Sequence, residues 1–261
     1  MKYILTIALF AVLFNILLAL PIQEANNEDV EVNPEESGDF FEGDMELNEE
    51  QMASLLYPDK RNGRIQERYR WPNNIVFYDL GNAFNDAQKA QIEKALRELE
   101  KLTCITFKPR TKTTKAYVYL TGEDSGCHSA VGHQNGKQRL NLKPNKPGFG
   151  CFKLGTIMHE FIHALGFYHQ QSASDRDNYV SIIWENIKDG KGHNFAKQPN
   201  TLVTDFGVKY DYGSIMHYSG LAFSKNGKAT IVPHDKTAKI GQRDGLSPSD
   251  IKKLKAMYKC H

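Results

Sequence analysis

One short stretch of the chain carries residues whose types and spacing could hold a metal ion. Residues 155–170 read GTIMHEFIHALGFYHQ and contain three histidines, His159, His163 and His169. Side chains four residues apart lie on one face of a helix, so the first two histidines can bind one ion together. Gly166 allows the chain to leave the helix through a left-handed turn, which can bring the third histidine round to the same ion.

Three imidazoles around zinc leave a fourth tetrahedral position for water, which is the arrangement of catalytic rather than structural zinc sites. Glu160 directly follows the first histidine and can take a proton from that water. A bare H-E-x-x-H occurs by chance in many helices. Here, however, a core-facing helix is predicted by apolar residues at Ile157, Phe161, Ile162 and Leu165. Histidines and a carboxylate without a ligand would be costly to bury there, which favours one catalytic zinc ion per chain.

The elements that must position this helix alternate between strand and helix before it. Runs rich in β-branched and aromatic residues predict strands at 74–80, 105–108 and 117–121. An apolar stripe predicts a helix over 85–102, with Asn85 or Asp86 as its N-cap.

The chain after the zinc helix is mostly irregular and ends in one further predicted helix. This helix begins at Ser247, has Pro248 in its first turn and Asp250 three residues after the cap, and runs to about Tyr258. We therefore expect an α+β domain of two halves with a cleft between them.

The first residues are typical of a secretory signal. Lys2 precedes an apolar run from Tyr3 to Leu20, and the small residue Ala19 lies near its end. A signal anchor is the alternative, but the run is barely long enough to span a bilayer. We expect residues 1–19 to be removed and the protein to be secreted without a membrane attachment.

Residues 20–61 form an acidic stretch that opposes the charge of the chain after it. They hold 13 acidic residues and only two basic ones, Lys60 and Arg61, and such a composition would not fold alone. Residues 62–261 hold 30 basic and 18 acidic residues, a net charge of +12. We predict a propeptide that docks on the following domain and ends at a dibasic processing site, and an acidic linker is the alternative.

All four cysteines lie within residues 62–261, at Cys104, Cys127, Cys151 and Cys260. An even number behind a secretory signal predicts two disulfides, and spacing alone leaves all three pairings open. A structural zinc finger is not expected, because the C-x-x-C spacing is absent.

Taken together, these features resemble the astacin family of metzincin zinc endopeptidases over essentially all of residues 62–261. Besides the histidine motif, the resemblance is carried by RWP at 70–72, GC at 126–127, GT at 155–156, DRDNYV at 175–180, YDY at 210–212, SIMHY at 214–218 and IGQR at 240–243. It implies the two-lobed metzincin fold, with a mixed sheet and helices in the first lobe, an irregular second lobe, and the zinc between them.

The resemblance implies a role for each residue of the site. Glu160 is the general base, and zinc is bound by His159, His163 and His169. Met216 forms a hydrophobic floor beneath the metal without ligating it. Tyr218 binds zinc at rest and swings away to stabilise the oxyanion. Arg243 lies near the pocket for the residue after the scissile bond and favours an acidic side chain there.

The resemblance also implies how the cysteines pair and how the enzyme is kept latent. It selects the disulfides Cys104–Cys260 and Cys127–Cys151. Residues 41–44, FEGD, resemble the F-x-G-D element whose aspartate occupies the zinc in the zymogen. Asp44 would thus displace the catalytic water until a trypsin-like protease cuts after Arg61, and the mature enzyme would begin at Asn62.

Two features depart from the family pattern. Gln170 stands where a glutamate usually follows the third histidine and helps to anchor the new N-terminus. A neutral amide can hydrogen-bond an ammonium group but cannot offset its charge. The second feature is His128 and His133 in the cysteine loop, where aromatic and basic residues are common, and further metal ligation is not expected there.

The leading hypothesis is a secreted, zymogen-activated zinc endopeptidase that acts as a monomer on proteins or peptides. A zinc-holding pseudoprotease that binds partners without cutting them is the alternative, and the intact Glu160 argues against it because metal binding alone requires no base. A third hypothesis is a relative of the matrixin type. It is weakened by the presence of Tyr218 and by the absence of cysteine from the predicted propeptide. Nucleic acid is not an expected partner, because no basic-aromatic stripe or recognition helix accompanies the basic charge.

Overall fold

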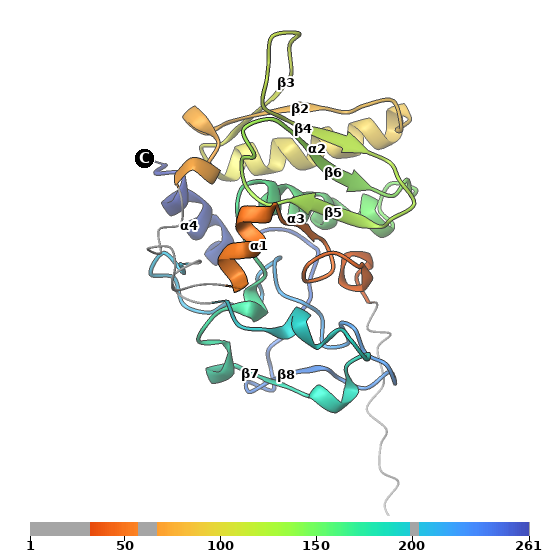
Figure 1. Cartoon of the computed structure of the whole chain (residues 1–261), viewed down its shortest axis with the longest axis vertical. Coiled ribbons are helices and arrows are strands. Elements are labelled where there is room, and N and C mark those ends of the chain that lie inside the picture. The colour runs from red at the N-terminus through yellow and green to blue at the C-terminus, as the bar shows by residue number, and fades with distance from the viewer. Residues whose placement is uncertain (1–31, 57–66, 199–203, 261) are drawn as a thin grey trace, which may run out of the picture.

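The computed structural model describes residues 32–56, 67–198 and 204–260. The predicted signal at 1–19, the dibasic site at Lys60 and Arg61, and the predicted new N-terminus at Asn62 lie outside these ranges. Figure 1 shows a lobe of sheet and helices above a mostly irregular lobe. The predicted α+β class and two-lobed architecture are confirmed.

The upper lobe is built on a six-stranded mixed sheet of order β1-β5-β6-β4-β2-β3. Its strands are β1 (Met45–Glu46), β2 (Ile75–Asp79), β3 (Thr106–Pro109), β4 (Tyr117–Thr121), β5 (Cys127–Ala130) and β6 (Lys137–Leu142). Neighbouring strands are parallel except for β5 and β6. The edge strand β1 lies in the acidic stretch at residues 20–61, which is predicted to be a propeptide and is called the pro-segment below. It covers β5 by pairing Met45 with Ser129 and Glu46 with Ala130.

Two helices pack together in the core of this lobe. α2 (Asp86–Leu102) begins with a capping box, in which the Asn85 side chain accepts from the Gln88 N–H and the Gln88 side chain accepts from the Asn85 N–H. α3 (Leu154–Ala164) is buried almost throughout, and its Phe161 ring packs edge-on against Phe107 at 5.5 Å. The core therefore fixes the position of the helix that carries the first two histidines.

The lower lobe contains little regular structure. β7 (Val180–Ile182) and β8 (Ile231–Pro233) form a two-stranded antiparallel sheet, and α4 (Pro248–Met257) follows near the end of the chain. α4 has the predicted capping box between Ser247 and Asp250. The pro-segment contributes one more helix, α1 (Glu49–Leu56). None of the helices in the described ranges has the length and apolarity that crossing a bilayer requires.

The two disulfides join Cys104 to Cys260 and Cys127 to Cys151, which are the pairings that the resemblance implied. The first ties the end of α2 to the chain after α4, across 156 residues. The second links β5 to the loop before α3, across 24 residues. The second disulfide therefore fixes the loop that leads directly into the histidine motif.

The two disulfides are expected to differ in their contribution to stability, because the longer closed loop restricts the unfolded chain more. Replacing Cys104 and Cys260 by serine should lower the free energy of unfolding by about 5 kcal/mol, against about 3.5 kcal/mol for the Cys127 and Cys151 pair. Urea titrations of the two double variants and the wild type measure this difference. Equal losses would contradict the expectation.

Candidate active site

The structure brings three histidines into one buried cluster, His159, His163 and His169, called the histidine cluster below. His159 and His163 come from one face of α3, and their Nε2 atoms lie 3.1 Å apart. The chain then turns at Gly166, whose φ of +105° lies in the region that favours glycine. This turn places the Nε2 atom of His169 at 3.4 Å from that of His159.

The other ring nitrogen of each histidine has a protein acceptor. The Nδ1 atoms of His159 and His163 lie 2.9 Å and 2.7 Å from the backbone carbonyl oxygens of Ile215 and Phe167. The Nδ1 atom of His169 lies 2.9 Å from a carboxylate oxygen of Glu42. A proton on Nδ1 leaves the Nε2 lone pair available, which is the state that a metal ligand requires.

Asp44 of the pro-segment reaches into the centre of the histidine cluster. Its carboxylate oxygens lie 3.0 Å from the Nε2 atom of His159, 3.5 Å from that of His163 and 3.3 Å from that of His169. Burial opposes ionisation of this carboxyl, but His169 and His163 outweigh it and hold the pKa of Asp44 well below its ordinary value. Burial also lowers the pKa of His169, yet Asp44 and Glu42 raise it to about 9.

The residues of this cluster fit a divalent metal ion. One ligand atom from each of Asp44, His159, His163 and His169 lies within 4.8 Å of the others, and all four side chains are buried. Buried carboxylates call for positive charge nearby, and three imidazoles with one carboxylate form a donor set that suits zinc.

Glu160 lies next to the cluster on α3 and is fully buried. Neither of its carboxylate oxygens has a hydrogen-bond partner among the described residues. Burial, and then the negative charge of Asp44, raise the pKa of Glu160 well above its ordinary value. A buried carboxyl that attracts a proton is suited to act as a base.

Met216 and Tyr218 lie in one turn, which the family resemblance implied to be next to the metal site. The turn is held by Asp250, which accepts from the Ser214 hydroxyl at 2.6 Å and from the Ile215 N–H at 2.9 Å. Both predicted side chains are buried, and the Tyr218 ring lies 4.7 Å from that of His169. The Tyr218 hydroxyl donates to the backbone carbonyl of Glu42, so the pro-segment holds it here.

Two residues at this site were missed by sequence reasoning. Glu42 binds His169 and also accepts from Gln198 at 2.7 Å, and the only signal for it was its place within the FEGD run. Asp250 was recognised as a helix cap, but its second contact, with the turn before Met216, was not foreseen.

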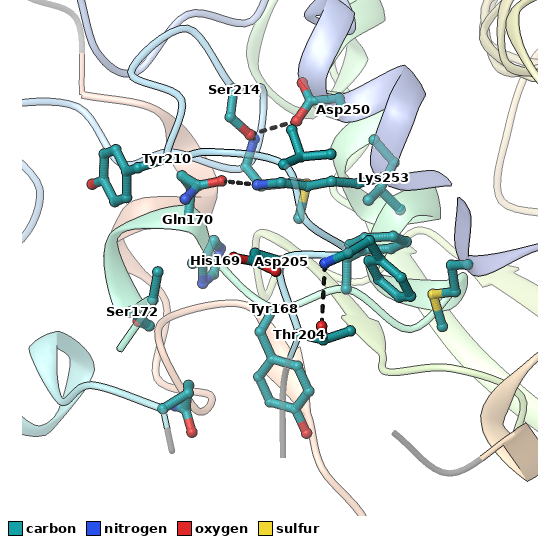
Figure 2. A pocket seen from close by; sticks show the side chains of 18 of the residues that line it. Tyr168, His169, Gln170, Ser172, Thr204, Asp205, Tyr210, Ser214, Asp250 and Lys253 are labelled. Carbon is teal, nitrogen blue, oxygen red and sulfur yellow. Dashed lines mark hydrogen bonds between the residues drawn. The ribbon is translucent and has the colours of Figure 1, made fainter. Parts of the chain in front are cut away.

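Gln170, the first departure from the family pattern, lines a cavity of about 400 Å³ (Figure 2). The Lys253 ammonium group donates to its side-chain oxygen at 2.5 Å, and both residues are buried. The amide that replaces the usual glutamate is therefore already paired with a cation from α4.

The two histidines of the cysteine loop lie apart from the histidine cluster. His128 is buried, with Nδ1 at 2.5 Å from Glu46 and Nε2 at 2.9 Å from the Ser125 hydroxyl. The His133 ring packs edge-on against Trp71 at 4.8 Å. Neither belongs to a group of possible metal ligands within the described residues.

Known proteins with similar sequences are zinc metalloproteases, which agrees with a metal site at the histidine cluster. The family model described as Astacin, a peptidase family, matches residues 63–259. Zinc metalloproteinase nas-13 of Caenorhabditis elegans is 41% identical over 205 residues, which cover 78% of this chain and 44% of that protein. Seminal metalloprotease 1 of Drosophila melanogaster is 39% identical over 234 residues, which cover 87% of this chain and 90% of that protein. The chain thus spans less than half the length of nas-13.

A solved structure shares the fold. High choriolytic enzyme 1, a hatching enzyme zinc-protease from the medaka Oryzias latipes, superposes with a TM-score of 0.67 at 36% identity. The match covers 74% of this chain and 94% of that one.

The turn at Gly166 yields a prediction about metal binding. A Cβ there would require a left-handed backbone and would lie 2.9 Å from the Met257 side chain, so Gly166→Ala should cost roughly 1–2 kcal/mol and displace His169. We expect zinc affinity to fall about tenfold or more, as measured by competition with a chromophoric chelator.

Gly148→Ala is the matched control, because Gly148 also has a positive φ (+89°) but has open space around its Cβ position. That variant should carry the backbone cost and keep full zinc affinity. Equal zinc affinity in the two variants would contradict the role of the turn.

Proposed function

The chain belongs to the astacin family of zinc metallopeptidases, and from this premise we propose that it is a secreted zinc endopeptidase made as a latent zymogen. The observation that carries the proposal is the buried set of His159, His163 and His169, with Asp44 of the pro-segment at its centre and Glu160 beside it. The three imidazoles would hold the zinc ion, and Asp44 would block it.

The chemistry follows from the groups around the cluster. When bound, zinc supplies Lewis acidity, which makes a water molecule acidic near neutral pH and polarises a peptide carbonyl. Glu160 would take the proton of the attacking water on a carboxylate oxygen and deliver it to the leaving amine. Tyr218 would donate its hydroxyl to the oxyanion once the pro-segment no longer holds it. Met216 would line the floor beneath the ion.

Latency is supported by three contacts of the pro-segment. Asp44 fills the centre of the histidine cluster, Glu42 accepts the Tyr218 hydroxyl through its backbone, and β1 covers the edge of β5. An extended substrate would need the same edge. A trypsin-like protease would release this segment by cutting after Arg61, and protein or peptide substrates would then enter the cleft. We propose that the released enzyme works as a monomer outside the cell.

Arg243 is proposed to bind an acidic substrate side chain after the scissile bond. Its side chain is buried. The pKa of His159 is lowered first by burial and second by the positive charge of Arg243. A cation so close to the histidine cluster would attract a carboxylate on the bound peptide.

The role of Glu160 is tested by Glu160→Gln in the processed enzyme. Peptide hydrolysis should fall by about 10²–10⁴-fold because the base is lost, whereas zinc measured by mass spectrometry should stay at one per chain. If the processed wild type were as inert as the variant, the alternative of a zinc-binding protein without activity would hold instead.

The blocking role of Asp44 is tested in the unprocessed chain by Asp44→Ala. Peptidase activity should rise about tenfold over the unprocessed wild type, since a charged contact is lost. It should stay below that of the processed enzyme, because β1 still covers β5. Asp39→Asn is the control, since Asp39 lies in the same segment and only forms an exposed pair with Lys191. Activity in Asp44→Ala no higher than in this control would refute the block.

A further inference from the structure

A second buried contact fastens the pro-segment beside the histidine cluster. Glu35 and Glu36 lie in a short 3₁₀ helix, Pro34–Ser37, and are both completely buried. Arg243 donates from Nε to Glu35 at 2.5 Å and from Nη2 to Glu36 at 3.3 Å. Buried carboxylates are costly unless their oxygens are bound, so this contact needs several donors.

Ser219 provides two of those donors. Its backbone N–H donates to one oxygen of Glu36 at 2.7 Å, and its hydroxyl donates to the other at 2.5 Å. The carboxylate is thus bound at both oxygens by one residue, which directly follows Tyr218. Asn33 of the pro-segment donates to Glu36 as well, at 2.8 Å, so that with Arg243 the carboxylate has four donors.

Contacts within the domain orient its side of this contact. The guanidinium of Arg243 is oriented by donating from Nη1 to the carbonyl oxygens of His217 at 3.1 Å and Gln242 at 2.8 Å. Gly241 allows the backbone to approach Ser219 closely, because a Cβ there would lie 2.4 Å from the Ser219 Cα atom. These contacts join residues of the domain only.

The contact also places two carboxyl groups around a single cation. Two carboxylates face one arginine, and one oxygen of Glu35 is buried without a hydrogen-bond partner among the described residues. Glu36 has the fuller set of donors, so it is the ligand for which the site is shaped. The second carboxylate shares only the charge of Arg243.

We propose that Arg243 and Ser219 form a carboxylate receptor, filled by Glu36 in the intact chain and by an acidic side chain of the substrate after the pro-segment leaves. The proposal rests on the proposed peptidase function and adds Ser219 as a second residue that determines specificity. The pro-segment thereby presents to the domain the same chemical group that the released enzyme recognises in its substrates.

The first arm of the test uses the intact chain and needs no peptidase activity. Deuterium uptake over residues 33–37 should be about tenfold faster in Glu36→Gln and in Ser219→Ala than in the wild type. Asp39→Asn and Ser181→Ala are the matched controls, because Asp39 pairs only at the surface and the exposed Ser181 bonds to His234. Uptake that is unchanged in both test variants would overturn the assignment of Glu36 to the receptor.

The second arm uses the same chains after processing, with peptides that carry Asp, Ala or Arg after the scissile bond. The wild type should prefer the peptide with Asp. In Ser219→Ala, the ratio of kcat/KM for the Asp peptide to kcat/KM for the Ala peptide should be about tenfold lower, mainly because KM for the Asp peptide rises. Glu36→Gln should behave as the wild type, since its substitution leaves with the pro-segment. A ratio in Ser219→Ala equal to that of Ser181→Ala would overturn the substrate role.

The two arms separate failure of this proposal from failure of the proposed function. If the processed wild type cleaved none of the peptides, the peptidase function would fail, and the uptake measurements would still decide how Glu36 is bound. Full zinc content and an unchanged melting temperature in Ser219→Ala show that a lost preference does not arise from misfolding.

Discussion

The arrangement of the two lobes and the pro-segment depends on one constraint, which is that several ionisable side chains are buried together at the histidine cluster. Three imidazoles and three acidic side chains, Asp44, Glu42 and Glu160, meet beside α3 and are buried. Each ionised form requires a partner of opposite charge or a hydrogen-bond donor. Backbone carbonyls, Asp44 and Glu42 satisfy this requirement for the three imidazoles, whereas the Glu160 oxygens have no hydrogen-bond partner among the described residues. A divalent cation would supply positive charge to the same site if the pro-segment left.

The sequence predicted best what is determined by neighbouring residues. The cap at Asn85 and the apolar stripe after it lie within a few turns of one helix, so α2 was placed to within one residue. The Ser247 cap of α4 and the strand β4 were also predicted from signals within a few neighbouring residues. The spacing of the histidines on α3 and the glycine after them likewise suffices to bring the cluster together.

The sequence did not predict contacts between distant parts of the chain. β5 consists of the four buried residues CHSA, and its place in the sheet comes from pairing with β6 and β1 rather than from a run typical of a strand. Glu36 was one of 13 acidic residues in the pro-segment, and nothing nearby distinguished it. Its partner Ser219 lies 183 residues away. Such contacts become visible only when the fold brings their partners together.

The position of β1 would separate two events in the proposed activation, cleavage of the chain and departure of the pro-segment. The outer edge of β5 offers one row of backbone donors and acceptors, and β1 pairs with two of its four residues, Ser129 and Ala130. The proposed cut after Arg61 would leave this pairing in place, so departure of the cut piece would be a distinct step with its own rate. At high protein concentration the cut piece would be able to rebind, and its dilution would then govern how quickly the cleft opens.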